Sequence, residues 1–204
     1  MPAAPRCILS HVPVEALARL AAEFPGIEIV QIPTSGEIPP DVSGEVLLTF
    51  TWASPNIHEA VKRGVRWIHT LGTGIDRFPL DALGDRILTC ARGASAIPIA
   101  EWTLAVMLAF EKQLPGTWVS EPPENWNMAQ LGSLHGKTLG LIGLGGIGEA
   151  IAARALPFDM RLRAIRRTLE PSRSPDVELT RDLFDLIASA DHLVVTAPAT
   201  PATR

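Results

Sequence analysis

Between residues 138 and 148 the chain reads Thr138-Leu139-Gly140-Leu141-Ile142-Gly143-Leu144-Gly145-Gly146-Ile147-Gly148. The apolar run before Gly143 predicts a buried strand, and the residues from Ile147 onward predict a helix. The glycines between them match G-x-G-x-x-G, a pattern that is weak alone because glycine clusters also make ordinary turns. Between a strand and a helix, the pattern predicts a turn that binds a dinucleotide.

The glycines of this turn have separate predicted roles. Gly143 makes the tight turn, Gly145 lets a pyrophosphate approach the backbone, and Gly148 leaves room where the helix meets the strand. The pyrophosphate would lie on the N–H groups at the helix N-terminus, where the helix dipole is positive. The alternative is a glycine-rich loop that binds nothing.

Two arginines follow the next predicted strand, which covers residues 161–165. Arg166 stands about 20 residues past the glycines, where an NAD site carries a carboxylate for the ribose 2′-hydroxyl. A carboxylate would repel a 2′-phosphate, whereas guanidinium groups bind phosphate well. Arg166 and Arg167 therefore predict NADP as cofactor, with NAD possible. The alternative is two solvated arginines at a strand end.

Predicted strands and helices alternate through the whole chain. The predicted strands cover residues 7–9, 27–32, 46–50, 66–69, 138–142, 161–165 and 192–196. The predicted helices cover residues 14–24, 56–62, 98–112, 147–156 and 183–188, with Pro98 as a first helical residue. Residues 114–131 include two adjacent prolines and predict an irregular arm. This alternation predicts βαβ units with parallel sheets.

The amino-acid composition indicates a globular protein and argues against several other classes of protein. With 47% hydrophobic and 20% charged residues among 204, the chain can build a packed core. The net charge of −4 gives no basic surface, so we expect no nucleic-acid partner. Two cysteines without metal-ligand spacing predict neither a disulfide framework nor a metal site. The absence of a long apolar run and of a signal-peptide pattern predicts a cytoplasmic protein without membrane contact.

Further segments, taken with the glycine turn, resemble a known family. They are residues 71–76, 92–103, 134–140 and 190–204, in that order. The chain resembles the D-isomer-specific 2-hydroxyacid dehydrogenases, in particular those of the glyoxylate/hydroxypyruvate reductase type. The resemblance implies an α/β protein with a flavodoxin-like substrate domain at residues 1–97. Residues 98–204 would form the inter-domain helix, the arm and the first β-α-β-α-β half of a Rossmann doubly wound domain.

The same resemblance implies hydride exchange between a nicotinamide and a small 2-hydroxy or 2-oxo acid, such as glyoxylate or hydroxypyruvate. The glycine loop Gly72-Thr73-Gly74 would direct backbone N–H groups at the substrate carboxylate. The alternative is a plain turn. Thr51 and Trp52, just past a buried strand, would lie on the substrate side, because ligands bind at strand carboxyl ends. Either could instead be a surface loop residue.

The resemblance also implies cofactor contacts. Thr103 would lie near the nicotinamide, Gly146 and Ile147 near the pyrophosphate, and Thr203 beside the dinucleotide. Gly146 departs from the family's usual larger residue, so one phosphate contact from a side chain is expected to be missing. Glu101 reads as a first-turn helix residue that favours the dipole rather than as a catalytic acid.

The family's catalytic arginine, glutamate and histidine are expected after Arg204, so the resemblance implies no catalytic residue within 1–204. The 204-residue chain alone is therefore expected to be inactive. We expect each histidine present to be a loop or strand residue: His11, His58, His69, His135 and His192. One branch of the family serves as corepressors, so the alternative function is a dinucleotide-sensing module without turnover. A chain that binds nothing is the third possibility.

The resemblance further implies a homodimer. In this family the inter-domain helix and the arm commonly pair two subunits. Trp102, Trp118 and Trp126 would supply the large aromatic area that such an interface uses. The alternative is that these rings belong to the core of one chain.

Overall fold

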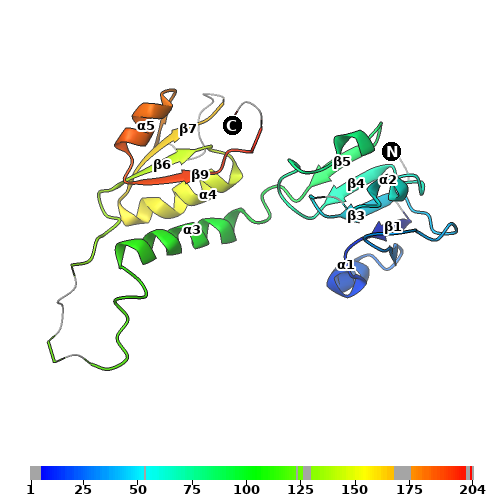
Figure 1. Ribbon diagram of the computed structural model, residues 1–204, viewed down its shortest axis with the longest axis horizontal. Coiled ribbons are helices and arrows are strands. Elements are labelled where there is room, and N and C mark those ends of the chain that lie inside the picture. Colours follow the sequence, from blue (N-terminus) through cyan, green and yellow to red (C-terminus); the bar gives the residue numbers. More distant parts are fainter. Residues whose placement is uncertain are drawn as a thin grey trace. The chain divides into compact units, whose positions relative to one another are not determined.

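The structure is a computed structural model that describes residues 6–52, 54–122, 124–125, 130–167, 176–200 and 203. Its contacts divide the chain into two compact units, Met1–Arg92 and Gly93–Arg204. Each unit holds one parallel β-sheet with helices packed on it (Figure 1). The predicted α/β class is therefore confirmed. The assignment of residues 1–97 and 98–204 to a substrate domain and a cofactor domain stays a prediction.

The first unit contains a five-stranded parallel sheet in the order β2-β1-β3-β4-β5. Its strands are β1 (Cys7–Ser10), β2 (Glu28–Gln31), β3 (Val46–Thr49), β4 (Trp67–Thr70) and β5 (Ile87–Cys90). This order is that of flavodoxin-like sheets, as the resemblance implied. The sequence reasoning did not identify β5, because it is a short run that directly follows a turn.

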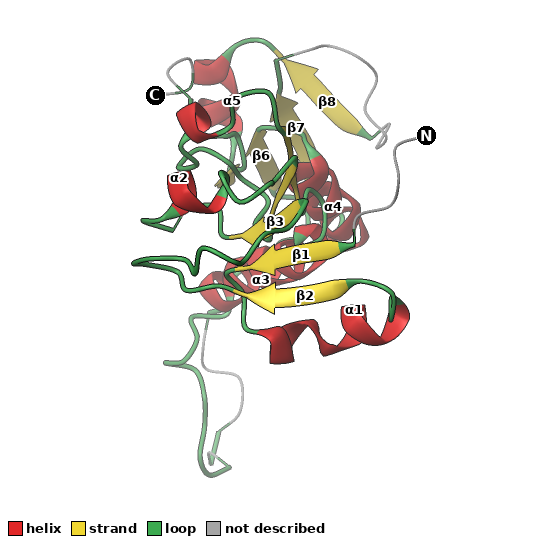
Figure 2. Ribbon diagram, turned by 90° about the vertical axis from the view of Figure 1, so that its right-hand side faces the viewer, coloured by secondary structure: helices red, strands yellow, loops and turns green. Residues whose placement is uncertain are grey.

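Helices cover both faces of the first sheet. The predicted helix at 14–24 is in fact a 3₁₀ turn, η1 (Val14–Leu17), followed by α1 (Ala18–Glu23). These pack beside β1 and β2 on one face (Figure 2). The helix α2 (Ile57–Ala60) packs on the other face, against a core that includes Leu9, Leu47 and Ile68. The alternation of strand residues between two cores explains why β3 is buried along its whole length.

The second unit contains a four-stranded parallel sheet in the order β8-β7-β6-β9. Its strands are β6 (Thr138–Ile142), β7 (Arg161–Ile165), β8 (Val177–Thr180) and β9 (His192–Val195). The predicted β-α-β-α-β pattern is wrong in its strand count, because β8 precedes α5 (Leu183–Ser189) and makes β9 the fourth strand. The chain builds outward from β6 to β8 and then returns to the other side of β6. This reversal is the topological switch point of a doubly wound sheet.

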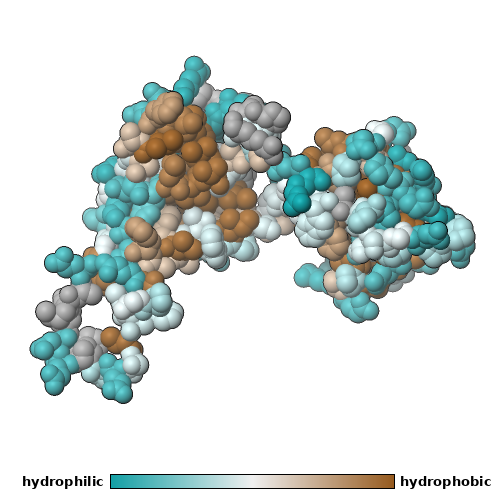
Figure 3. All heavy atoms as spheres, viewed as in Figure 1, coloured by the Kyte–Doolittle hydropathy of each residue, from teal (hydrophilic) through white to brown (hydrophobic). Residues whose placement is uncertain are grey.

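The edge position of β9 leaves apolar surface exposed. Leu193 and Val195 of β9 are exposed, as are Phe184 and Ile187 of α5. Together they form the apolar area over α5 and β9 in Figure 3. Within the described ranges, no helix is both long enough and apolar enough to cross a membrane.

The long helix of the second unit is α3 (Ala96–Glu111), which packs along α4 (Gly146–Ala155) (Figure 1). The predicted start at Pro98 is wrong by two residues, because Ala96 and Ile97 also adopt helical geometry and Pro98 is the third helical residue. Glu101 therefore lies beyond the first turn, and its carboxylate contacts the Arg154 guanidinium at 3.7 Å. The predicted dipole role of Glu101 is thus also wrong.

The arm at residues 114–131 contains neither a helix nor a strand in its described part. Hydrogen bonds tie its two ends together: Gly132 N donates to Glu111 O, and Lys112 Nζ donates to Gly132 O. Trp118 is exposed, as is Trp102 of α3, so neither belongs to the core. Trp126 lies outside the described residues.

Candidate functional site

The glycine turn joins β6 to α4 at the carboxyl edge of the second sheet. Gly143 has φ of +104°, and a Cβ there would lie 2.7 Å from the backbone N of Ala197. A Cβ on Gly148 would overlap the carbonyl oxygen of Gly143. Both positions therefore require glycine, the first for its left-handed backbone and both for backbone contact. The tight turn and the close packing match the roles that the motif predicted.

The other two glycines of the turn face open space. A Cβ on Gly145 or Gly146 would meet no atom within 4 Å. Gly146, Ile147 and Gly148 are the first three residues of α4, so their N–H groups have no acceptor within the helix. No other acceptor contacts these N–H groups among the described residues. The turn thus presents unbonded donors and a positive dipole end beside an open approach, which fits a phosphate group.

The two residues that follow β9 form hydrogen bonds to the glycine turn and to the end of β6. Thr196 N and Ala197 N both donate to Ile142 O, and Thr196 Oγ1 donates to Gly143 O at 2.8 Å. The sequence reasoning did not identify Thr196 as a supporting residue. A hydroxyl residue at the end of a strand was the only available signal.

The arginine pair lies at the same edge as the turn. Ile165, the last residue of β7, pairs with Ile142, and Gly143 N donates to Ile165 O at 2.9 Å. Arg166 and Arg167 follow directly, the first half-buried and the second exposed. They therefore flank the glycine turn on the next strand, as the spacing predicted.

Two further predicted cofactor residues have their hydroxyl groups bonded locally. Thr103 is buried in α3, and its Oγ1 donates to Ile99 O at 2.8 Å. Thr203 is exposed in the turn after β9, where its Oγ1 accepts a hydrogen bond from Thr200 N. Their contacts with a cofactor stay predictions.

The predicted substrate residues lie at the carboxyl edge of the first sheet. A Cβ on Gly72 would overlap the Thr51 side chain, so these two residues are in contact. The N–H groups of Gly72, Thr73 and Gly74 have no acceptor among the described residues. Trp52 is 59% exposed and stacks on Phe50, with ring centroids 4.9 Å apart. The structure therefore joins Thr51 to the glycine loop and holds Trp52 against Phe50.

The histidines occupy varied environments. His58 lies inside α2, which corrects its prediction as a loop or strand residue, and its ring contacts Asp81 at 3.4 Å. His135 is exposed beside Asp159, whereas His69 of β4 lies 2.8 Å from Thr89 Oγ1. His11 is buried, and the side chain of His192 is nearly buried.

A buried ion cluster lies at the amino-terminal edge of the second sheet, opposite the glycine turn. Glu111 Oε1 accepts hydrogen bonds from Lys137 Nζ at 2.5 Å and His192 Nε2 at 2.7 Å. The hydrogen bond from Lys137, followed by that from His192, lowers the pKa of Glu111 below its usual value against the effect of burial. The cluster joins the end of α3 to the starts of β6 and β9, a structural role away from the candidate site.

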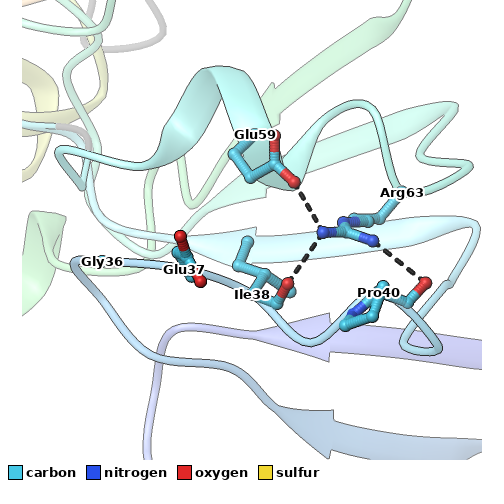
Figure 4. A pocket seen from close by; sticks show the side chains of 6 residues that line it. All are labelled: Gly36, Glu37, Ile38, Pro40, Glu59 and Arg63. Carbon is cyan, nitrogen blue, oxygen red and sulfur yellow. Dashed lines mark hydrogen bonds and ion pairs between the residues drawn. The ribbon is translucent and has the colours of Figure 1, made fainter.

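A hollow of about 470 Å³ lies in the first unit beside α2 (Figure 4). Its Arg63 guanidinium donates to Ile38 O at 2.7 Å, Pro40 O at 3.0 Å and Glu59 Oε1 at 2.6 Å. These contacts hold the loop after β2 against α2. None of the predicted site residues lines this hollow. Among the described residues, no group of three or more His, Cys, Asp or Glu side chains is arranged to hold a metal.

A parallel sheet whose strand order reverses beside such a glycine turn defines a dinucleotide-binding α/β unit. The family model described as "D-isomer specific 2-hydroxyacid dehydrogenase, NAD binding domain" matches residues 104–204. Residues 104–204 therefore carry the NAD-binding domain of the D-isomer specific 2-hydroxyacid dehydrogenase family, which confirms the resemblance over this part of the chain.

Two curated relatives illustrate the similarity. The chain is 34% identical to the hydroxypyruvate reductase of Thermotoga maritima over 173 residues, which are 82% of this chain and 55% of that protein. It is 34% identical to the D-3-phosphoglycerate dehydrogenase of Methanocaldococcus jannaschii over 139 residues, 65% of this chain and 26% of that protein. The chain thus spans between about a quarter and about half of these relatives.

Solved structures share the fold. D-mandelate dehydrogenase of Rhodotorula graminis matches with a TM-score of 0.75 and 19% identity, over 100% of this chain and 68% of that one. D-lactate dehydrogenase of Aquifex aeolicus, solved with NAD and lactic acid, matches with a TM-score of 0.74 and 21% identity, over 97% and 62%. At these identities the likeness concerns the fold alone.

Proposed function

We propose that the chain forms the cofactor-binding and carboxylate-binding parts of an NADP-dependent dehydrogenase for a small 2-hydroxy or 2-oxo acid, such as glyoxylate or hydroxypyruvate. The proposal rests mainly on the glycine turn. Gly143 and Gly148 pack against backbone atoms, whereas Gly145 and Gly146 face open space beside N–H groups that have no acceptor among the described residues. The hydroxypyruvate reductase relative supports the choice of acid, because its match covers 82% of this chain.

The dinucleotide would lie across the switch point. Its pyrophosphate would accept hydrogen bonds from the N–H groups of Gly146 and Ile147, with Gly145 leaving room for the approach. Arg166 and Arg167 would bind the 2′-phosphate, and this contact is the basis for preferring NADP over NAD. The bound nicotinamide would supply or accept the hydride, with Thr103 near it.

The acid would be held by its carboxylate. The N–H groups of Gly72, Thr73 and Gly74 point to no acceptor in the described chain, and successive free N–H groups of this kind bind anions. Thr51, which contacts Gly72, would border the same site. None of the histidines within residues 1–204 is proposed as the acid–base group.

The proposal includes a cytoplasmic homodimer. Trp102, Val106 and Phe110 of α3 are exposed and lie at helical spacing. Cys7 and Cys90 are both free thiols, as is usual in the reducing cytoplasm. Sedimentation as a monomer at micromolar concentration would contradict the dimer.

Calorimetric titration of the chain with NADPH and with NADH tests the cofactor assignment. We expect saturable binding of both, with the tighter binding for NADPH. Absence of binding heat with either dinucleotide, in a sample whose circular dichroism shows the α/β fold, would contradict the proposal.

A further inference from the structure

A row of buried polar side chains crosses the first sheet where its strands end. His11 follows β1, Thr49 ends β3 and Thr70 ends β4, and each is at most 2% exposed. Thr49 and Thr70 are register partners, and His11 Nδ1 lies 2.8 Å from Thr49 Oγ1. Two residues earlier on each strand are the core residues Leu9, Leu47 and Ile68. The row is therefore a polar layer between the apolar core and the loops at the carboxyl edge.

Thr49 links His11 to the candidate carboxylate loop. Its side chain contacts the His11 ring, while its backbone carbonyl accepts a hydrogen bond from Leu71 N at 3.0 Å. Leu71 directly precedes Gly72, which in turn packs against the side chain of Thr51. The loop at residues 72–74 is thus attached to the end of β3 at Thr49 and to Thr51, two residues past the strand.

The Asn56 side chain also interacts with the His11 ring. Asn56 Nδ2 donates to Pro33 O at 2.8 Å and Gly36 O at 3.2 Å, which fixes the orientation of the amide. Its Oδ1 and the His11 Nε2 are both buried and have no hydrogen-bond partner. Because Oδ1 can only accept, a proton on Nε2 is the tautomer that suits an acceptor beside the ring. Nδ1 then accepts from the Thr49 hydroxyl.

We infer that His11, as the neutral Nε2–H tautomer, is a positioning residue that holds Thr49 and thereby the loop at residues 72–74. The inference rests on the carboxylate-binding role proposed for that loop. Burial lowers the pKa of His11 to about 4, against a smaller opposite effect of the Asn56 contact, so the ring is neutral at physiological pH. A neutral ring adds no cation beneath the loop and acts through geometry alone.

The first test is spectroscopic and uses the unaltered chain. Long-range ¹H–¹⁵N correlation spectra of histidine-labelled protein report which ring nitrogen carries the proton. We expect the Nε2–H form for His11 at pH 7. A proton on Nδ1, or a charged ring, would overturn the inference.

The second test uses Thr49→Val, which keeps the side-chain shape and removes the hydroxyl. We expect amide hydrogen exchange at Leu71 to accelerate at least tenfold and to return in Thr49→Ser. The chain offers a matched control, because Thr89 Oγ1 lies at the same 2.8 Å distance from the ring of His69 without a bond to the loop. Unchanged exchange in Thr49→Val, or equal acceleration in Thr89→Val, would contradict the positioning role.

A third measurement separates this inference from the proposed function. Oxalate, a small dianion, is titrated into the unaltered chain and into Thr49→Val in the presence of NADPH. We expect the variant to bind oxalate at least fivefold more weakly. No binding to the unaltered chain would contradict the carboxylate role of the loop, while the tautomer and exchange results would still decide the role of His11.

Discussion

Glycine loops follow a strand in each of the two units, but they are held in different ways. In the second unit, Gly143 and Gly148 are fixed by backbone atoms of the turn and of the segment after β9. In the first unit, Gly72 is fixed by a side chain, that of Thr51, and rests above a layer of polar side chains. A glycine that contacts backbone atoms cannot be replaced without moving the backbone. A glycine that contacts a side chain can be replaced when that side chain changes as well.

This difference suits the two proposed ligands. NAD and NADP contain the same pyrophosphate, so backbone N–H groups can bind it in either cofactor. Hydroxy acids differ from one another beside the carboxylate, and a loop that packs against the Thr51 side chain can be adapted to them. We therefore expect changes in the second unit's turn to affect folding and cofactor binding, and changes in the first unit's loop to affect the acid.

Gly143→Ala should destabilise the protein more than any other substitution considered below. The added Cβ would lie 2.7 Å from backbone N of Ala197, at a φ of +104° that alanine rarely adopts. We expect the free energy of unfolding of the second unit to fall by about 4 kcal/mol. Denaturant unfolding with hydrogen exchange resolved by unit measures it. Gly146→Ala, which meets open space, is the control, and equal losses in the two variants would show that the turn is not held by backbone.

The arginine pair makes the next prediction. Arg166→Asp with Arg167→Ala should remove two charge-assisted phosphate contacts, each about 1.5–3 kcal/mol, and shift preference from NADP toward NAD. Calorimetric titration of both cofactors measures the change. Arg161→Ala, at the opposite end of β7, should leave the ratio unaltered. Equal affinity of the unaltered chain for the two cofactors would count against the assignment.

The polar layer of the first unit predicts a pH effect. Burial lowers the pKa of His11 to about 4 from an ordinary 6.5. Between these two pH values the His11 ring is protonated in the unfolded chain and neutral in the folded chain. Stability is therefore fully present above pH 6.5 and falls as pH drops toward 4, by about 2 kcal/mol between pH 7 and pH 5. Urea unfolding at the two pH values measures this loss. A His11→Phe variant that keeps the same pH dependence would show that another group titrates.

A substitution at Gly72 should lower the stability of the first unit only slightly. An added Cβ would overlap the flexible Thr51 side chain, so Gly72→Ala should cost about 1–2 kcal/mol of stability. Removal of the obstructing methyl in Thr51→Ser should restore most of that loss in the double variant, measured as a double-mutant cycle. Additive losses would mean that Gly72 is held by something other than Thr51.

Sequence reasoning reached the glycine turn because all its determinants lie within a dozen residues. It missed β8, because Val177–Thr180 is a short run with two polar residues, and it started α3 too late because Pro98 fits several positions of a first helical turn. The polar layer of the first unit could not be predicted from the sequence for a different reason. His11 and Thr49 are 38 residues apart and Thr196 and Gly143 are 53 apart, so only the sheet topology brings them together.

The open face of the glycine turn is the proposed binding site of the dinucleotide. Gly145→Val tests this role, because a Cβ at Gly145 meets no protein atom within 4 Å and the branched side chain would extend into the space proposed for the pyrophosphate. Gly26→Val is the matched control, since Gly26 has equally open surroundings in the other unit. We predict that NADPH titration gives no binding to a folded Gly145→Val protein and unchanged binding to Gly26→Val. Undiminished NADPH affinity in folded Gly145→Val would contradict a pyrophosphate site at the turn.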